Sequence, residues 1–113
     1  MHEMSLAEGV VQILQDNAVS QGYDRVKKVW LEIGRLSNVE VESMRFCFDA
    51  VTRNTVAEGA ELEIIQTPGQ GWCLACSQGV EINSMYDCCP NCEDVQVQVT
   101  GGTEMRVKEL EVE

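Results

Sequence analysis

The residues best suited to chemistry in this chain are four cysteines in two C-x-x-C pairs: Cys73 with Cys76, and Cys89 with Cys92. Residues 77–88 separate the pairs, a span that one small hairpin can fold back across. Two such turns can point four sulfurs at one centre, which is the tetrahedral thiolate geometry that Zn²⁺ accepts. We predict a closed structural zinc site, with no open position for catalysis. A rubredoxin-like iron site is the rival, because C-P-x-C turns occur there too.

The two other cysteines fall outside this pattern. Cys88 precedes Cys89, but only Cys89 has the two-residue spacing to Cys92, so we assign Cys88 as a spare thiol. Cys47 lies on the apolar face of a predicted helix, where a small buried side chain is expected. The N-terminus lacks the residue order of an export signal. Six cysteines in such a chain indicate a reducing compartment, the cytoplasm, where paired cysteines hold metal.

His2, the only histidine, makes the N-terminus a second candidate metal site. The Met1 amine, the His2 amide nitrogen and the His2 imidazole can close two fused chelate rings. Glu3 can supply a fourth donor through its amide or its carboxylate. Nitrogen donors in one plane suit Ni²⁺ or Cu²⁺. The alternative is a disordered terminal histidine, which the tripeptide alone favours. The predicted helix start at Ser5 and the surrounding acidic charge raise the odds of a metal site.

Length and charge limit the partners. The 113 residues suffice for one domain, or for one domain carrying a small module. The formal charge is −11, and four thiolates with one zinc ion give −11 − 4 + 2 = −13. Such a field repels phosphate backbones and attracts cations and basic protein surfaces, so no nucleic-acid partner is expected. No apolar run approaches the roughly 20 residues of a membrane span, so no membrane association is expected.

The first predicted element is a helix over residues 5–20. Ser5 and Glu8 fit a capping box at its start, and Gly22 is a plausible stop. Met1-His2-Glu3 would then precede the helix and lie beside the domain. Its apolar stripe recurs at i, i+4, i+7 and i+8 and comprises Leu6, Val10, Ile13 and Leu14.

The later elements alternate between strand and helix patterns. Alternating apolar residues predict strands over 26–33 and 61–67, and a β-rich segment over 105–112 that returns to the first sheet. A helix is expected over 39–54, with Ser37 and Asn38 as candidate caps. Its apolar face would hold Met44, Cys47, Phe48 and Val51.

Glycine-rich breaks set off the segment with the cysteines. Residues 68–71 interrupt the pattern before the first pair, and residues 101–102 interrupt it after the second. Val95, Val97 and Val99 alternate with glutamines and predict one strand between these breaks. The expected fold is α+β: a small α/β domain of two helices on a mixed sheet, residues 1–70 plus 103–113, with an inserted Cys₄ zinc-ribbon module at 71–102.

Several segments occur together in an order that resembles the HypA/HybF family of hydrogenase maturation nickel proteins. They are Met-His-Glu at 1–3, Val-Trp-Leu-Glu-Ile-Gly at 29–34, Arg-Phe-Cys-Phe at 45–48, Val-Ala-Glu-Gly at 56–59 and the two C-x-x-C pairs. The resemblance covers nearly the whole chain. The one departure from the family pattern is Cys88, an additional thiol beside a ligand.

The resemblance implies a nickel metallochaperone and not an enzyme. Its partners would be the GTPase HypB and the large subunit of [NiFe]-hydrogenase. A second copy of the chain is a further candidate partner, in a weak homodimer. The family's nickel motif falls on Met1, His2 and Glu3, and Glu40 occupies the place of an acidic residue that approaches nickel in some relatives. The structural zinc ligands fall on Cys73, Cys76, Cys89 and Cys92.

Three other readings stay open at this point. A zinc-ribbon interaction module, for example one that binds nucleic acid, fits the cysteines but is opposed by the charge of −11. A small iron electron carrier is a second reading. An independent enzyme is the least favoured, because the chain has no second histidine, no Ser/His/Asp set and no phosphate-binding glycine loop.

Overall fold

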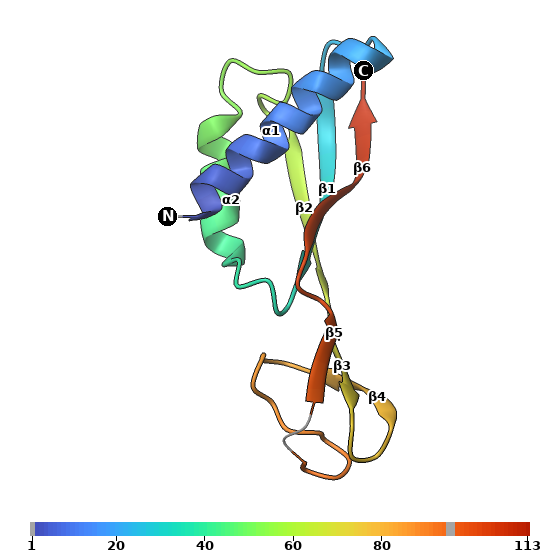
Figure 1. The fold of residues 1–113 in the computed structure, drawn as a ribbon. Helices are drawn as coiled ribbons and strands as arrows, with labels where there is room; N and C mark the ends of the chain where they lie inside the picture. The colour runs from blue at the N-terminus through green and yellow to red at the C-terminus, as the bar shows by residue number, and fades with distance from the viewer. Residues whose placement is uncertain (1, 95–96) are drawn as a thin grey trace. The chain divides into compact units, whose positions relative to one another are not determined.

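The computed structural model of the chain describes residues 2–94 and 97–113. It divides into two compact units. The helical unit comprises Met1–Leu31, Val39–Ile65 and Arg106–Glu113, and the cysteine unit comprises Glu32–Asn38 and Gln66–Met105. The elements, labelled in Figure 1, are α1 (His2–Gln21), β1 (Val26–Gly34), α2 (Val41–Val51), β2 (Glu61–Thr67), β3 (Gly69–Cys73), β4 (Gln78–Ile82), β5 (Val97–Gly101) and β6 (Met105–Val112).

A mixed sheet in the order β2-β1-β6 carries the two helices. Lys28, early in β1, pairs with Glu61 at the start of β2, and the Arg35 N–H after β1 donates to Thr67 O at the end of β2. These two strands are therefore parallel. The Glu113 N–H after β6 donates to Arg25 O before β1, so β6 is antiparallel to β1. The predicted α+β class, with two helices and a mixed sheet, is confirmed.

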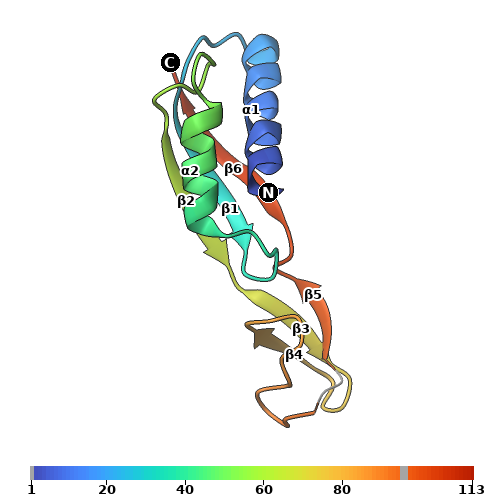
Figure 2. The same ribbon diagram turned by 90° about the vertical axis from the view of Figure 1, so that its left-hand side faces the viewer.

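Both helices lie over the same face of this sheet and pack against each other (Figure 2). The face that they cover is apolar because alternate side chains of β1 point to it. Each large side chain buried there stabilises the fold by roughly 1.5–3 kcal/mol. The fully or almost fully buried residues of this core include Ala7, Val10, Leu14, Val29, Leu31, Met44, Cys47 and Phe48.

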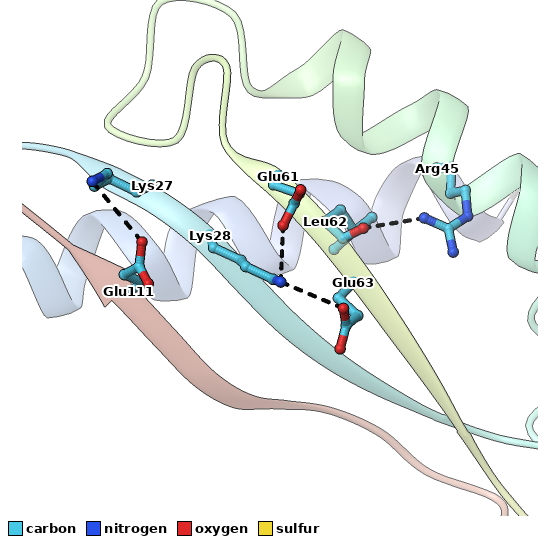
Figure 3. Close-up of polar contacts among 7 residues, drawn as sticks. All are labelled: Lys27, Lys28, Arg45, Glu61, Leu62, Glu63 and Glu111. Carbon is cyan, nitrogen blue, oxygen red and sulfur yellow. Dashed lines mark hydrogen bonds and ion pairs between the residues drawn. The ribbon is translucent and has the colours of Figure 1, made fainter.

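Polar contacts along the strands support the packing (Figure 3). An Arg45 guanidinium N–H in α2 donates to Leu62 O in β2 at 3.1 Å. The ammonium of Lys27 in β1 lies 4.0 Å from the Glu111 carboxylate in β6. These exposed pairs contribute little to stability individually, but they link neighbouring elements in the observed register.

The first helix differs from the prediction at its start. It begins at His2, so Ser5 lies inside the helix and the predicted capping box is wrong. The early start has a tertiary cause: Glu3 is 6% exposed, and its carboxylate accepts a hydrogen bond from the Glu40 N–H at 3.3 Å. Ile13, placed on the apolar stripe, is 55% exposed. The predicted stop is confirmed, because Gly22 adopts φ +77° and its N–H donates to Ala18 O.

The second helix is shorter than predicted and has a different cap. It runs over Val41–Val51, and its N-cap is Glu40 rather than Ser37 or Asn38. Those two residues belong to a turn: the Ser37 N–H donates to Gly34 O, and Asn38 adopts φ +64°. The strands predicted over 26–33, 61–67 and 105–112 are confirmed within one residue. Val95 of the fourth predicted strand lies outside the described residues; β5 begins at Val97.

The cysteine unit contains a second sheet, antiparallel throughout, in the order β4-β3-β5. Gly71 of β3 must lack a side chain because a Cβ there would collide with Val97 across the strand pair. A small core on the inner face holds Leu36, Cys73, Val80, Ile82 and Cys89, with Cys76, Val97 and Val99 packed against it. Neither helix of the described residues has the length and apolar character that crossing a bilayer requires.

Candidate metal centres

The four predicted zinc ligands meet at one point of the cysteine unit. Cys73 ends β3, Cys76 lies in the turn toward β4, and Cys89 and Cys92 lie in the turns before β5. The Cys73 and Cys92 sulfurs are 3.6 Å apart, and those of Cys76 and Cys89 are 3.8 Å apart. All four lie within 4.8 Å of one another. A tetrahedron with Zn–S bonds of about 2.3 Å has S···S edges of about 3.8 Å, so the cage has the size that zinc requires.

Backbone amides orient the sulfurs in both turns. The Cys76 N–H points at Cys73 Sγ at 3.5 Å, and the Asn91 N–H points at Cys89 Sγ at 3.4 Å. Hydrogen bonds of this kind favour the thiolate that a metal needs. Cys73 and Cys89 are buried, whereas Cys92 is exposed. The site is therefore anchored in the small core on one side and reachable by metal from the other.

The thiols of the cluster perturb one another's ionisation. A hydrogen bond from the Cys92 backbone lowers the pKa of Cys89 to about 7. Contact with the Cys73 sulfur, followed by burial, raises the pKa of Cys76 to about 12. These opposite shifts mean that the thiols of Cys76 and Cys89 do not ionise together unaided. A divalent cation at the centre supplies the charge that makes four thiolates compatible.

The two remaining cysteines stay apart from this cluster. Cys88 is exposed and is not among the four sulfurs that converge, although it adjoins Cys89. Cys47 is fully buried in the apolar face of α2, as expected for a small hydrophobic residue. The two-residue spacing was thus enough to distinguish Cys89 from its neighbour.

The second candidate site lies at the start of α1. Met1 is outside the described residues. The His2 side chain is 51% exposed, and its Nε2 lies 3.3 Å from a Glu3 carboxylate oxygen. The same oxygen, Oε2, accepts the N–H of Glu40. With Nε2 held by Glu3, Nδ1 is the imidazole nitrogen left for a six-membered chelate ring with the His2 amide.

Glu40 reaches this site through its backbone, while its side chain caps α2. The two carboxylate oxygens accept the N–H groups of Ser43 at 2.7 Å and Glu42 at 3.3 Å. These hydrogen bonds, the one from Ser43 first, hold the pKa of Glu40 below its usual value. Over residues 2–94 and 97–113, the ligand atoms of His2, Glu3 and Glu40 do not converge as the four sulfurs do.

Sequence reasoning missed the double contact of Glu3. The signal was nonetheless present: Glu3 precedes Ala7 by four residues and Val10 by seven, in phase with the buried stripe of α1. An acidic residue in that phase must be buried, and a buried carboxylate needs donors. Its partners are the imidazole beside it and the backbone amide of Glu40, the N-cap of the neighbouring helix.

Comparison with known proteins places these sites in a family context. A family model described as "Hydrogenase/urease nickel incorporation, metallochaperone, hypA" matches residues 1–112. The chain is 61% identical over 113 residues to the hydrogenase maturation factor HypA of Azotobacter chroococcum and 59% identical to that of Azotobacter vinelandii, with 100% of each chain covered.

Solved structures agree with the fold. The solution structure of the Ni metallochaperone HypA from Helicobacter pylori superposes with a TM-score of 0.71 at 24% identity, covering 97% of this chain and 96% of that one. A second solution structure, of a HypA protein, superposes with a TM-score of 0.72 at 25% identity, covering 99% and 96%. The fold of this chain is thus shared with both solved structures over almost their whole length.

Proposed function

We propose roles for particular residues from the premise that this chain belongs to the HypA family of hydrogenase/urease nickel-incorporation metallochaperones. The observation that carries this premise is the match of the family model to residues 1–112. The chain is accordingly a nickel metallochaperone of hydrogenase maturation, and its four-cysteine cluster fits a structural zinc ion. The family is one of metallochaperones rather than of enzymes.

The cargo Ni²⁺ binds at the N-terminus in this proposal, through the Met1 amine, the His2 amide and imidazole, and Glu3. Support comes from the start of α1 at His2. The first four N–H groups of a helix have no intrahelical acceptor, so the amides of His2 and Glu3 can lose their protons to a metal without breaking the helix ladder. The contact of Glu3 with Nε2 leaves Nδ1 available.

The charge of the site fits a metal chelated by deprotonated amides. A bare cation is disfavoured at a helix N-terminus, where the macrodipole is positive. Each amide that ionises cancels one charge of Ni²⁺, and the buried Glu3 carboxylate adds a further negative charge. Glu40, which we propose as an additional acidic group near nickel, lies next to Glu3 through its backbone N–H. The site therefore favours ions that ionise amides, as Ni²⁺ and Cu²⁺ do.

Two metals then serve two tasks. Zinc on Cys73, Cys76, Cys89 and Cys92 fixes the module at 71–102, while nickel is held by the domain at 1–70 plus 103–113. A half-exposed terminal site can be dismantled by protons or by the ligands of a partner, which suits a cargo. We propose that the cargo passes, with the GTPase HypB, to the large subunit of [NiFe]-hydrogenase in the cytoplasm.

The test is a nickel titration of the untagged, zinc-loaded chain beside His2→Ala and a variant with one glycine added before Met1. We expect one nickel per chain in the parent protein and loss of binding in both variants, because each removes a chelate donor. Zinc measured by mass spectrometry should stay at one per chain, and Cys88→Ser should retain both metals. Equal nickel binding in all proteins, or binding only by displacement of zinc, would refute the terminal site.

A further inference from the structure

Trp72 lies on the outer face of the sheet in the cysteine unit. Along β3, burial alternates: Gly69, Gly71 and Cys73 are buried, whereas Gln70 and Trp72 are exposed. The Trp72 side chain, 42% exposed, is therefore turned away from the small core around the cysteines. A large aromatic side chain in this position covers no part of that core and is partly open to solvent.

A shallow hollow of about 390 Å³ lies beside the Trp72 ring. Trp72 is paired with Gly79 on β4 and with Gln98 on β5. A Cβ built at Gly79 would meet nothing within 4 Å, so the space next to the ring is open. We call this surface the Trp72 face; it is lined by Pro68, Gln70, Trp72, Gly79, Glu81 and Thr100, all from the cysteine unit.

The segment that forms this face is strongly acidic. Residues 66–105 contain five acidic residues and no lysine, arginine or histidine. With four thiolates and a zinc ion, the segment would carry −5 − 4 + 2 = −7. Glu81 lines the hollow itself. The one basic residue of the unit, Arg35, donates its guanidinium N–H to Asn83 Oδ1 at 3.0 Å.

In the helical unit, the other tryptophan has a cation against its ring. There the Lys28 ammonium lies 4.7 Å from the Trp30 ring centroid. The same ammonium pairs with Glu61 at 2.9 Å and Glu63 at 3.4 Å on the next strand (Figure 3). Ring, cation and strand carboxylates thus form one group. The Trp72 face has the ring and the carboxylate of Glu81, and residues 66–105 have no cation to offer.

We propose that the Trp72 face docks a basic, extended segment of a partner protein. An arginine or lysine side chain of that segment stacks on the Trp72 ring in the space that Gly79 leaves open, and it pairs with Glu81. The charge of the segment favours this partner over nucleic acid, whose phosphates it would repel. The surface uses none of the proposed nickel ligands, so docking and cargo binding can be measured separately.

The experiment is an NMR titration of the intact, untagged, zinc-loaded chain with a blocked peptide of four Arg-Gly repeats. We expect saturable shifts of the Trp72 indole N–H and the Gly79 amide. The signal of the Trp30 indole N–H should not shift, because the Lys28 ammonium already lies against that ring. A blocked peptide of four Glu-Gly repeats should cause no shifts at the Trp72 face.

Three variants locate the contact. Gly79→Val fills the open space and, like Trp72→Ala, should weaken binding by about tenfold or more, as for the central residues of an interface. Glu81→Gln should weaken binding and reduce its dependence on salt. Glu104→Gln makes the same charge change at another exposed acidic residue of the unit and should leave affinity within about twofold. Zinc content and amide dispersion show whether each variant is folded.

Several results would overturn the proposal. One is equal weakening by Glu81→Gln and Glu104→Gln, which would reduce the effect to overall charge. A second is a Trp72 indole N–H signal that does not shift when the Arg-Gly peptide is added. A third is an unchanged affinity for this peptide in folded Gly79→Val. Saturable shifts at the same residues with an oligothymidylate, and none with the basic peptide, would assign the face to nucleic acid instead.

Discussion

Glu3 contacts two groups that come from different parts of the chain. Its Oε2 lies 3.3 Å from His2 Nε2 and accepts the Glu40 N–H at the same distance. A carboxylate that is 6% exposed is costly to bury unless such partners compensate the lost hydration. The same contacts orient the imidazole that the proposed nickel chelate uses. The packing of α1 against the start of α2 and the orientation of a proposed nickel ligand therefore depend on the same side chain.

Replacing Glu3 by glutamine should separate these two roles. Glu3→Gln keeps an oxygen acceptor for Glu40 but removes the negative charge beside His2. We expect nickel affinity to fall about 10- to 100-fold, as for other groups that orient a metal-binding histidine, with zinc content unchanged. Calorimetric titration measures the affinity, and Glu8→Gln on the exposed side of α1 is the matched control. Parent-like nickel affinity in Glu3→Gln would rule out the orienting role.

Residue-level reasoning from the sequence succeeded where spacing decides and failed where distant contacts decide. The cysteine cluster follows from two short spacings, because each C-x-x-C turn brings its own sulfurs together. The partner of Glu3 is 37 residues away, at Glu40. The helical phase of Glu3 indicates that it is buried, but no local pattern indicates which distant residue it contacts. The bridge between the two helices therefore became visible only with their packing.

The cap of α2 determines how this element responds to acid. Glu40 accepts the N–H groups of Glu42 and Ser43, and these bonds lower its pKa in the folded state. A lowered folded pKa means that the stabilisation is present above the unfolded pKa of about 4.3 and is lost as pH falls through the folded value. Acid should therefore weaken the start of α2.

Glu40→Ala tests this dependence. We expect the variant to melt a few degrees below the parent near pH 7, because two amides of α2 lose their acceptor. The difference should be smaller at about pH 3, because protonation of the parent carboxylate as the pH falls removes the charge that accepts the two amide N–H groups. Thermal unfolding followed by helical circular dichroism measures both values, and Glu40→Asp should recover much of the loss. An equal deficit at both pH values would contradict a charged cap.

Elements with a clear period were predictable, and their ends were not. Val29 and Leu31 alternate with polar residues and fall on the covered face of β1. Ser37 and Asn38 have the side chains that caps prefer, yet Ser37 closes a turn on Gly34 O and Asn38 follows it with a positive φ. Glutamate is an uncommon cap, and its selection here depends on the path of the chain toward Glu3.

At the scale of the whole molecule, the two units should differ in their need for zinc. Both helices belong to the helical unit, whereas the cysteine unit has three short strands and a small core. Such a core buries too little surface to fold without metal. Removing zinc with a chelator should abolish the dispersed signals of Trp72 and Gly79 while most helical circular dichroism remains.

The control is to add zinc back to the chelated protein and record the spectra again. The Trp72 and Gly79 signals should then return together. Loss of the helical signal in step with zinc would show that the two units fold as one. The same measurement would then also count against the division between a zinc module and a nickel-binding domain.

The overall class was predictable because glycine breaks and cysteine spacing delimit the module. The assignment of residues 32–38 to the cysteine unit was harder to foresee. Leu36 is buried against the cluster of Cys73, Val80 and Ile82, far along the chain. This packing makes the segment between β1 and α2 part of the cysteine unit. A hydrophobic residue in a turn does not indicate which core it will join.

The position of β6 has a consequence for biosynthesis. This strand follows all four cysteines in the chain, yet it completes the β2-β1-β6 sheet beside β1. While the protein emerges from the ribosome, β1 has an open edge until the last strand arrives, and open edges invite wrong pairing. By then every cysteine of the zinc cluster has been synthesised. Translation thus completes the set of zinc ligands before the sheet that carries the two helices can close.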